Sequence, residues 1–219
     1  MSSTNPPTTP IAHNKTQAMS RVLDLIPRGY SRWLSGQVPV EKAEALAQKF
    51  HDQYGIGCTP AQRITRKKNG IANACLVLYW PEHTKTVEWL LLATQGIGLE
   101  SEALRRVDAK PRLRWLGYEL VRHTTRQKAT WTWKRTAEQM ADWYALLGSV
   151  LNRQQMFKVT SVLESVARQP GFHGIREQSW ALCQFARERG FAGEIPHVYF
   201  QQKCSHGERL VLRHTTMTQ

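Results

Sequence analysis

No stretch of this 219-residue sequence contains the ~18 consecutive apolar residues that a membrane-spanning helix requires. The opening segment, Met1–Pro10, is rich in Ser, Thr and Pro, and it lacks both the basic start and the apolar core of a secretory signal peptide. These absences predict a cytoplasmic protein that has no membrane partner.

Cysteine is also scarce, and its spacing is irregular. Thiols without paired spacing favour reduced, mostly buried side chains over a disulfide framework. A zinc site that combines Cys183 or Cys204 with His197 and His206 lacks the Cys-x2-4-Cys knuckle that structural zinc normally takes. We therefore expect no metal and no cofactor. The cysteines are Cys58, Cys75, Cys183 and Cys204.

Motifs of nucleotide-dependent and hydrolytic enzymes are missing. The sequence contains no Gly-x-x-x-x-Gly-Lys-Ser/Thr, no His-Glu-x-x-His and no Gly-x-Ser-x-Gly. A single Gly-x-Gly at Gly96–Gly98 lacks the third glycine of a dinucleotide site. The acidic residues lie mainly on predicted helices beside bases, which argues against the carboxylate cluster of a two-metal nuclease. This pattern favours a binding protein over an enzyme.

Acidic residues are few relative to basic ones. The chain has 30 Lys and Arg residues against 17 Asp and Glu residues, a formal charge of +13 and a pI of about 10.0. Hydrophobic residues make up 41% of the chain, which indicates a globular core. The surplus of positive charge repels itself unless an acidic partner neutralises it. Nucleic acid, DNA or RNA, is the commonest such partner.

The stretch Leu113–Arg135 predicts a β-hairpin, because aromatic and β-branched residues flank a short polar segment, Thr124–Lys128. Side chains alternate across a strand, so Trp131 and Trp133 should share one face. A cationic rim beside an aromatic face suits a polyanion whose bases stack. The same pattern is also typical of a hairpin that simply buries one face and exposes the other to solvent, so a purely structural role is the alternative. The candidate nucleic-acid contacts here are Arg122, His123, Arg126, Lys128, Lys134 and Arg135.

A second basic cluster lies on a short predicted helix, Ala61–Lys68, for which Thr59 is a good N-cap and Pro60 a good first residue. Cations at its C-terminal end are candidate phosphate contacts. They also interact favourably with the helix dipole, so a structural role has its own physical basis. The cluster consists of Arg63, Arg66, Lys67 and Lys68.

The first half of the chain is predicted to form a sheet with flanking helices. Apolar residues at three- and four-residue intervals predict a helix over Val40–Tyr54. Near-continuous apolar stretches at Ile71–Trp80 and Thr86–Thr94 predict central strands of an antiparallel sheet. The Leu113–Arg135 hairpin is expected to extend that sheet. Also expected are a loop at Pro27–Gly36 and a short helix at Glu100–Val107.

After Arg135 the pattern changes from strands to helices, which marks the expected domain boundary. Caps and apolar spacing predict helices over Ala137–Leu151, Met156–Val166 and Ile175–Arg189. Two strands then form an expected C-terminal hairpin. This element order is that of a winged helix, and it also arises when the hairpin completes the upstream sheet. The two strands are expected at Ile195–Lys203 and Glu208–His214.

These predictions define an α+β fold, with an antiparallel sheet built from β-hairpins and flanking helices, followed by a helical C-terminal part that ends in a hairpin. The expected domains are a disordered tail over residues 1–17, a sheet domain over residues 18–135 and a helical region over residues 136–219.

The segments Gly29–Glu44, Tyr54–Arg63 and Asn73–Pro81 are similar to small uncharacterised accessory proteins carried by bacterial plasmids and integrating conjugative elements. The resemblance covers roughly the first half of the chain. It implies a mobile-element setting, and it transfers no catalytic motif.

The leading hypothesis is a basic nucleic-acid-binding accessory protein of a bacterial mobile element. It would make mainly backbone contacts and act with other subunits of a nucleoprotein complex. One alternative is a metal-independent nuclease in which a histidine is the general base and a Lys or Arg stabilises the phosphorane. His123 is the first candidate for this base, and His51, His83 and His173 are others. Another is a protein-interaction subunit whose basic surface meets an acidic partner.

Overall fold

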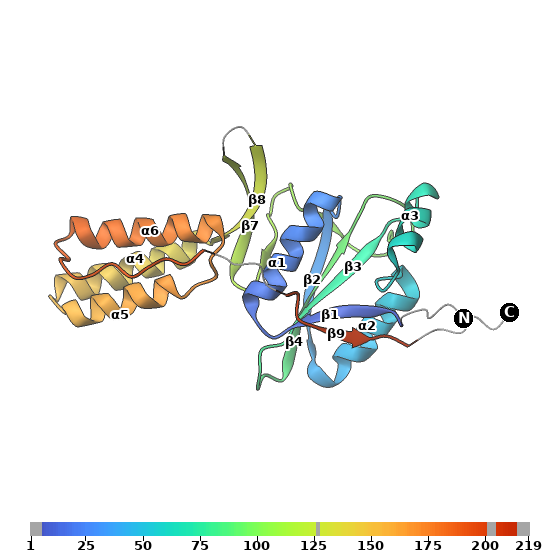
Figure 1. The fold of residues 1–219 in the computed structure, drawn as a ribbon, viewed down its shortest axis with the longest axis horizontal. Helices are drawn as coiled ribbons and strands as arrows, with labels where there is room; N and C mark the ends of the chain where they lie inside the picture. The colour runs from blue at the N-terminus through green and yellow to red at the C-terminus, as the bar shows by residue number, and fades with distance from the viewer. Residues whose placement is uncertain (1–5, 126–127, 201–204, 214–219) are drawn as a thin grey trace. The chain divides into compact units, whose positions relative to one another are not determined.

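The computed structural model describes residues 6–125, 128–200 and 205–213. The chain divides into two compact units, Met1–Pro111 with Cys204–Gln219, and Arg112–Lys203. The fold is α+β, as predicted, and Figure 1 shows its helices and strands. None of the helices formed by the described residues combines the length and apolar character needed to cross a membrane.

A mixed six-stranded sheet forms the centre of the first unit, in the order β5-β2-β4-β3-β1-β9. β1 runs parallel to β3, whereas the other neighbouring strands pair antiparallel, so the sheet is not the purely antiparallel one predicted. The predicted central strands, β3 and β4, do lie in its middle. The strands are β1 (Thr8–Ala12), β2 (Arg32–Pro39), β3 (Ala74–Tyr79), β4 (Thr86–Ala93), β5 (Arg105–Arg106) and β9 (Glu208–Val211).

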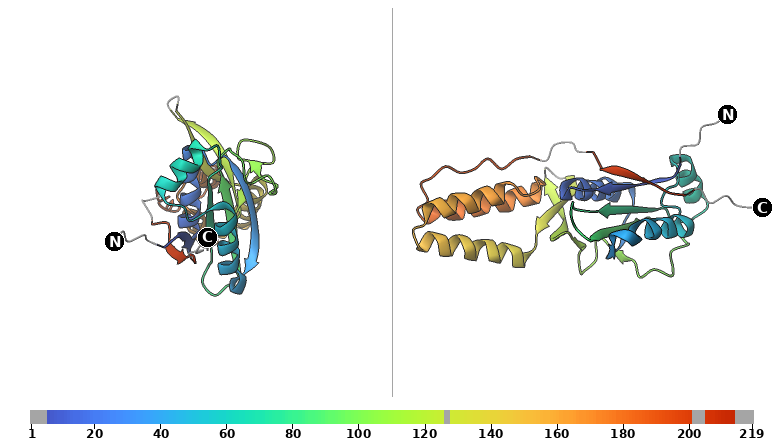
Figure 2. Two further views of the ribbon diagram at one scale, coloured as in Figure 1. Left: turned by 90° about the vertical axis from the view of Figure 1, so that its right-hand side faces the viewer. Right: turned by 90° about the horizontal axis from the view of Figure 1, so that it is seen from below.

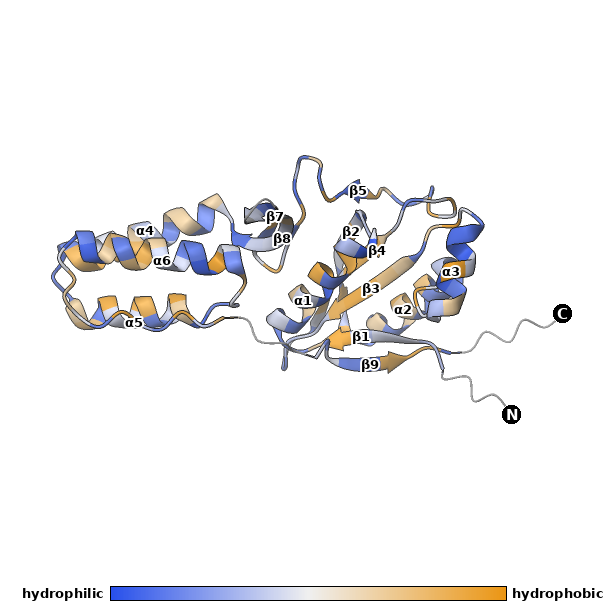
Figure 3. Ribbon diagram, turned by 45° about the horizontal axis from the view of Figure 1, so that its top comes forward, coloured by the Kyte–Doolittle hydropathy of each residue, from blue (hydrophilic) through white to orange (hydrophobic). Residues whose placement is uncertain are grey.

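Helices pack on both faces of β3. Phe50, in the helix over Val40–Tyr54, lies in one apolar cluster with Leu76 and Leu78 of β3. On the opposite face, the Arg21 guanidinium donates a hydrogen bond of 3.9 Å to the Cys75 sulfur. This two-sided burial explains the continuous apolar sequence of β3 (Figure 3). The helices are α1 (Lys15–Leu25), the 3-10 helix η1 (Ile26–Arg28), α2 (Val40–Tyr54) and α3 (Pro60–Lys68).

Three local predictions for this unit are wrong. Residues 8–12 form strand β1 and not part of a disordered tail, because β3 and β9 supply their backbone partners. Residues 32–36, predicted as loop, belong to β2 and pair with β4. The helix predicted at Glu100–Val107 does not form, and Arg105 and Arg106 pair with β2 instead.

The predicted C-terminal hairpin is also wrong. Residues 195–200 form no strand, and residues 201–204 lie outside the described part of the chain. The final strand, β9, pairs antiparallel with β1, with Leu210 opposite Thr9. The last strand therefore completes the upstream sheet, and the element order of a winged helix is not realised.

The second unit consists of a small antiparallel sheet and a group of helices. The Leu113–Arg135 hairpin lies in this separate sheet and does not extend the first. The two units therefore divide after Pro111, and not after Arg135 as predicted. The helices lie alongside one another (Figure 2) and share an apolar cluster that includes Leu147, Leu163 and Leu182. The elements are β6 (Arg114–Trp115), β7 (Tyr118–Thr125), β8 (Lys128–Arg135), α4 (Ala137–Asn152), α5 (Met156–Ala167) and α6 (His173–Glu188).

The start of α6 approaches β8 closely at Gly174. Its backbone N–H donates a hydrogen bond of 3.1 Å to the Thr132 hydroxyl, and an added Cβ would lie 2.7 Å from the Trp133 carbonyl oxygen. We expect Gly174→Ala to lower the free energy of unfolding by about 1–3 kcal/mol, because the backbone must shift to admit the methyl group.

The matched control is Gly148→Ala in α4, where an added Cβ meets nothing within 4 Å. This change should raise the free energy of unfolding by about 0.5–1 kcal/mol, since alanine is the better helix former. Urea unfolding of both variants measures the difference. A Gly174→Ala protein as stable as Gly148→Ala would contradict the close approach.

Candidate nucleic-acid interface

The predicted hairpin is present as the antiparallel pair β7 and β8. Its register places Leu120 opposite Trp133 and Arg122 opposite Trp131. Because side chains alternate along a strand, these four side chains share one face of the hairpin. The prediction that the two tryptophans lie on one face is confirmed.

The two ends of this aromatic face differ in exposure. Leu120 and Trp133 are both 0% exposed, so that end belongs to the core. Farther along, Trp131 is half-buried and Arg122 is exposed, and the Arg122 Cζ lies 5.6 Å from the centre of the Trp131 ring. A guanidinium over an indole face is a cation–π pair. The accessible end of the face thus presents a cation and an aromatic ring together.

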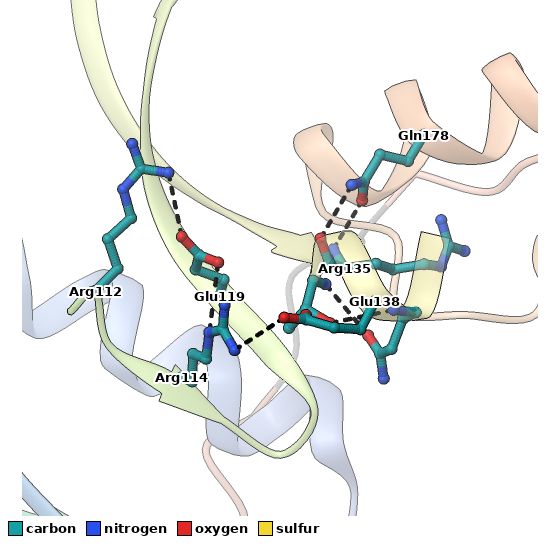
Figure 4. Close-up of polar contacts among 8 residues, drawn as sticks. Arg112, Arg114, Glu119, Arg135, Glu138 and Gln178 are labelled. Carbon is teal, nitrogen blue, oxygen red and sulfur yellow. Dashed lines mark hydrogen bonds and ion pairs between the residues drawn. The ribbon is translucent and has the colours of Figure 1, made fainter. Parts of the chain in front are cut away.

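Glu119 is the only acid in the sequence of the predicted hairpin, and it is already paired. Arg112 donates a hydrogen bond of 3.1 Å to it, and the Arg114 Nε lies 3.6 Å from its other oxygen. Arg114 also lies 3.6 Å from a carboxylate oxygen of Glu138 (Figure 4). The pKa of Glu138 is lowered by hydrogen bonds from its own backbone N–H and from the Thr136 hydroxyl, and by the positive charge of Arg114. Both carboxylates are therefore matched by local arginines and add little net negative charge to the hairpin.

Arg135 was predicted as a nucleic-acid contact, and this prediction is wrong because its side chain is buried, with 3% exposure. Its guanidinium donates hydrogen bonds to the Ile175 carbonyl at 3.1 Å, the Val166 carbonyl at 3.3 Å and the Ser179 hydroxyl at 2.9 Å. Burial lowers the pKa of Arg135 to about 10, so the group remains charged at neutral pH. Arg135 connects β8 to α5 and α6.

The remaining hairpin cations have different settings. The Lys134 ammonium lies 3.4 Å from a carboxylate oxygen of Glu177, so its charge is already paired. Lys128 is the first residue of β8, but its side chain is outside the described ones, as is the whole of Arg126. Among the described candidates on the hairpin, Arg122 is the exposed cation on the aromatic face.

His123 lies on the opposite face of β7 from Arg122, because consecutive strand residues point to opposite sides. The centre of its ring is 4.0 Å from that of His173, the first residue of α6. Glu177 lies one helical turn further along, and the His173 Nε2 is 3.1 Å from its carboxylate. His123 therefore belongs to a polar group that is separate from the Arg122–Trp131 pair.

The second predicted cluster lies on α3, in the first unit. The helix begins as predicted, with Thr59 in a capping box. Arg63 and Arg66 donate hydrogen bonds of 2.7–3.3 Å to backbone carbonyls around the helix. Lys67 and Lys68 are exposed. The arginines therefore stabilise the local fold, and the lysines remain candidate phosphate contacts.

Sequence reasoning missed Glu177 and did not connect it with His173, which was one of the histidines considered as a general base. The four-residue spacing of His173 and Glu177 is visible in the sequence, and residues four apart lie on the same face of a helix. Their closeness to His123 was not available, because it depends on how α6 packs on β8. Reasoning from the sequence also missed Arg112 and Arg114 as the partners of Glu119.

No family model matches this chain, and no significant similarity to a curated protein or to a solved structure was found. The resemblance to mobile-element proteins stays a prediction.

Proposed function

We propose that this chain is a nucleic-acid-binding protein that contacts its partner through the exposed end of the β7–β8 hairpin. The observation that carries the proposal is the exposed Arg122 guanidinium over the Trp131 ring. The cation neutralises a phosphate, and the accessible part of the indole offers a surface on which a base stacks. In a chain of net charge +13, such a pair matches the chemistry of a polyanion that has aromatic bases.

This chemistry favours contacts to the backbone and stacking over sequence recognition. A guanidinium–indole pair accepts any base, because every base has an aromatic face. Lys67 and Lys68 of the first unit would add phosphate contacts without adding specificity. We therefore infer a general binder of DNA or RNA. The resemblance of its first half to mobile-element proteins supports a role in a nucleoprotein complex of such an element.

The test measures binding of the full chain to fluorescent single-stranded and double-stranded oligonucleotides over a range of salt concentrations. Binding dominated by phosphate contacts gives a linear fall of log K with log salt, with a slope of about −2 to −4.5 for three to five contacts. Single strands should bind at least as tightly as duplexes, because stacking requires unpaired bases. An affinity that does not change with salt would contradict the proposal.

A nuclease is the second candidate, and the closeness of His123 to His173 supports it. One imidazole could act as general base and the other as general acid in metal-independent cleavage of RNA. Cleavage of labelled RNA that persists in excess chelator, and that His123→Ala abolishes, would establish this activity. Binding without cleavage under the same conditions leaves the first candidate.

A further inference from the structure

Three side chains with metal-binding atoms converge in the second unit, on the face of the hairpin opposite Arg122. They are His123 from β7 and His173 and Glu177 from α6, and one ligand atom of each lies within 4.8 Å of those of the other two. We infer that this group binds one divalent transition-metal ion of the zinc type through two imidazole nitrogens and a carboxylate oxygen. The site is separate from the proposed nucleic-acid contact.

The spacing on α6 already suits a metal. Residues at positions i and i+4 of a helix project from one face, which is the spacing that pairs two zinc ligands in helical metal sites. The His173 Nε2 and the nearer Glu177 carboxylate oxygen are 3.1 Å apart. This matches the separation of about 3.3 Å between two ligands of a tetrahedral zinc ion with bonds of about 2.0–2.1 Å. These two residues need little movement to share an ion.

The third ligand is positioned by the packing of α6 on the sheet. Strand alternation directs His123, Thr132 and Lys134 to the face that α6 covers. The Gly174 N–H donates a hydrogen bond to the Thr132 hydroxyl, and the absence of a side chain on Gly174 allows the close approach. This contact brings the rings of His173 and His123 to a centroid separation of 4.0 Å. Small rotations of the two imidazoles would bring a nitrogen atom of each within bonding distance of the same ion.

The Glu177 carboxylate lies between the Lys134 ammonium and the His173 imidazole. Lys134 lies 3.4 Å from its Oε2, while His173 lies beside its Oε1, so the two oxygens have different partners. The Oε1 atom is the one that lies beside the His173 imidazole.

Three protein ligands leave a coordination position for water or another molecule, as in catalytic zinc sites and unlike the closed four-ligand structural ones. His173 and Glu177 line a hollow of about 530 Å³, which Arg176, Trp180, Ile195 and His197 also line. Because Arg176 lines this hollow together with two of the three proposed ligands, the hollow suits an anion. The chemical class of ligand that the site would take is therefore a phosphate or carboxylate.

The test uses the untagged full chain after removal of bound metal with a chelator, titrated with Zn²⁺ by calorimetry and with Co²⁺ by absorbance. We expect one Zn²⁺ per chain and a Co²⁺ spectrum without thiolate charge-transfer bands. His123→Ala, His173→Ala and Glu177→Gln should each weaken Zn²⁺ binding about tenfold or more, since loss of an outer-shell partner alone costs about 10–100-fold. Circular dichroism confirms that each variant is folded, and Glu177→Gln keeps the shape of the side chain.

The matched control is His83→Asn, because His83 is an exposed histidine of the first unit with a positive φ of 65° that asparagine tolerates. It should bind Zn²⁺ as the unchanged chain does. Three results would overturn the inference: equal binding by Glu177→Gln and the unchanged chain, thiolate bands in the Co²⁺ spectrum, or no binding by the unchanged chain. None of these measurements depends on nucleic acid, so failure here leaves the proposed function standing.

Discussion

Replacing Arg122, Arg126 and Lys128 together by glutamine should make the salt dependence of nucleic-acid binding less steep, by about 2 to 3 in the slope of log K against log salt. Each phosphate contact contributes about 0.7 to 0.9 to that slope, depending on the nucleic acid. Arg122 is the member of this set whose side chain is described and exposed, and the other two follow it in the sequence of the same hairpin. The loss in affinity at low salt should be about tenfold or more. Fluorescence anisotropy at several salt concentrations measures both quantities.

The control removes the same charge from another surface of the same unit. Arg153, Lys158 and Arg168 are exposed on or next to α4 and α5, and their joint replacement by glutamine lowers the net charge equally. This variant should keep nearly the full salt slope. If both triple variants lose the same slope, the positive charge acts diffusely, and the hairpin is not the contact surface.

Arg135→Met should lower the free energy of unfolding by about 2–4 kcal/mol. The change leaves the buried Ser179 hydroxyl without this donor. It also takes one donor from each of the Val166 and Ile175 carbonyls, which still accept from the Gln169 N–H and the Ser179 hydroxyl. A buried acceptor that loses its partner destabilises the fold by about 1–3 kcal/mol. Burying a charge is itself unfavourable, so removal of the guanidinium offsets part of that destabilisation. Urea unfolding of the full chain, followed by tryptophan fluorescence, measures the difference.

Arg122→Met is the matched control for that experiment, because it makes the same substitution at an exposed position of the neighbouring strand. It should change stability by no more than about 0.5 kcal/mol. The two variants should therefore separate two roles: Arg122 affects binding and Arg135 affects folding. Equal stability of the two proteins would contradict a structural role for Arg135.

Local pattern predicted much of the secondary structure. The helix over Val40–Tyr54 appears at the predicted residues, and α3 begins after the predicted Thr59 cap. α4 likewise follows Thr136, whose hydroxyl accepts a hydrogen bond from the Gln139 N–H. These features depend on residues within one or two turns of each other, so a single sequence contains the information.

Strand partners were harder to predict. β1 lacks a hydrophobic period, yet it pairs with β3 and β9, which lie far away in the sequence. The Leu113–Arg135 hairpin was assigned to the central sheet, but it forms a sheet of its own. Backbone hydrogen bonds carry no side-chain signature, so the choice of partner depends on the packing of the whole chain.

The sequence by itself determined the charge surplus, the helices with their caps and the alternation that places Trp131 and Trp133 on one face. Only the tertiary structure decided that Arg135 is buried while Arg122 stays exposed, and that His123 meets His173 and Glu177. The physical reason is that a local pattern sets the direction of a side chain within its own element. Its exposure and its neighbours are set by the elements that pack against it.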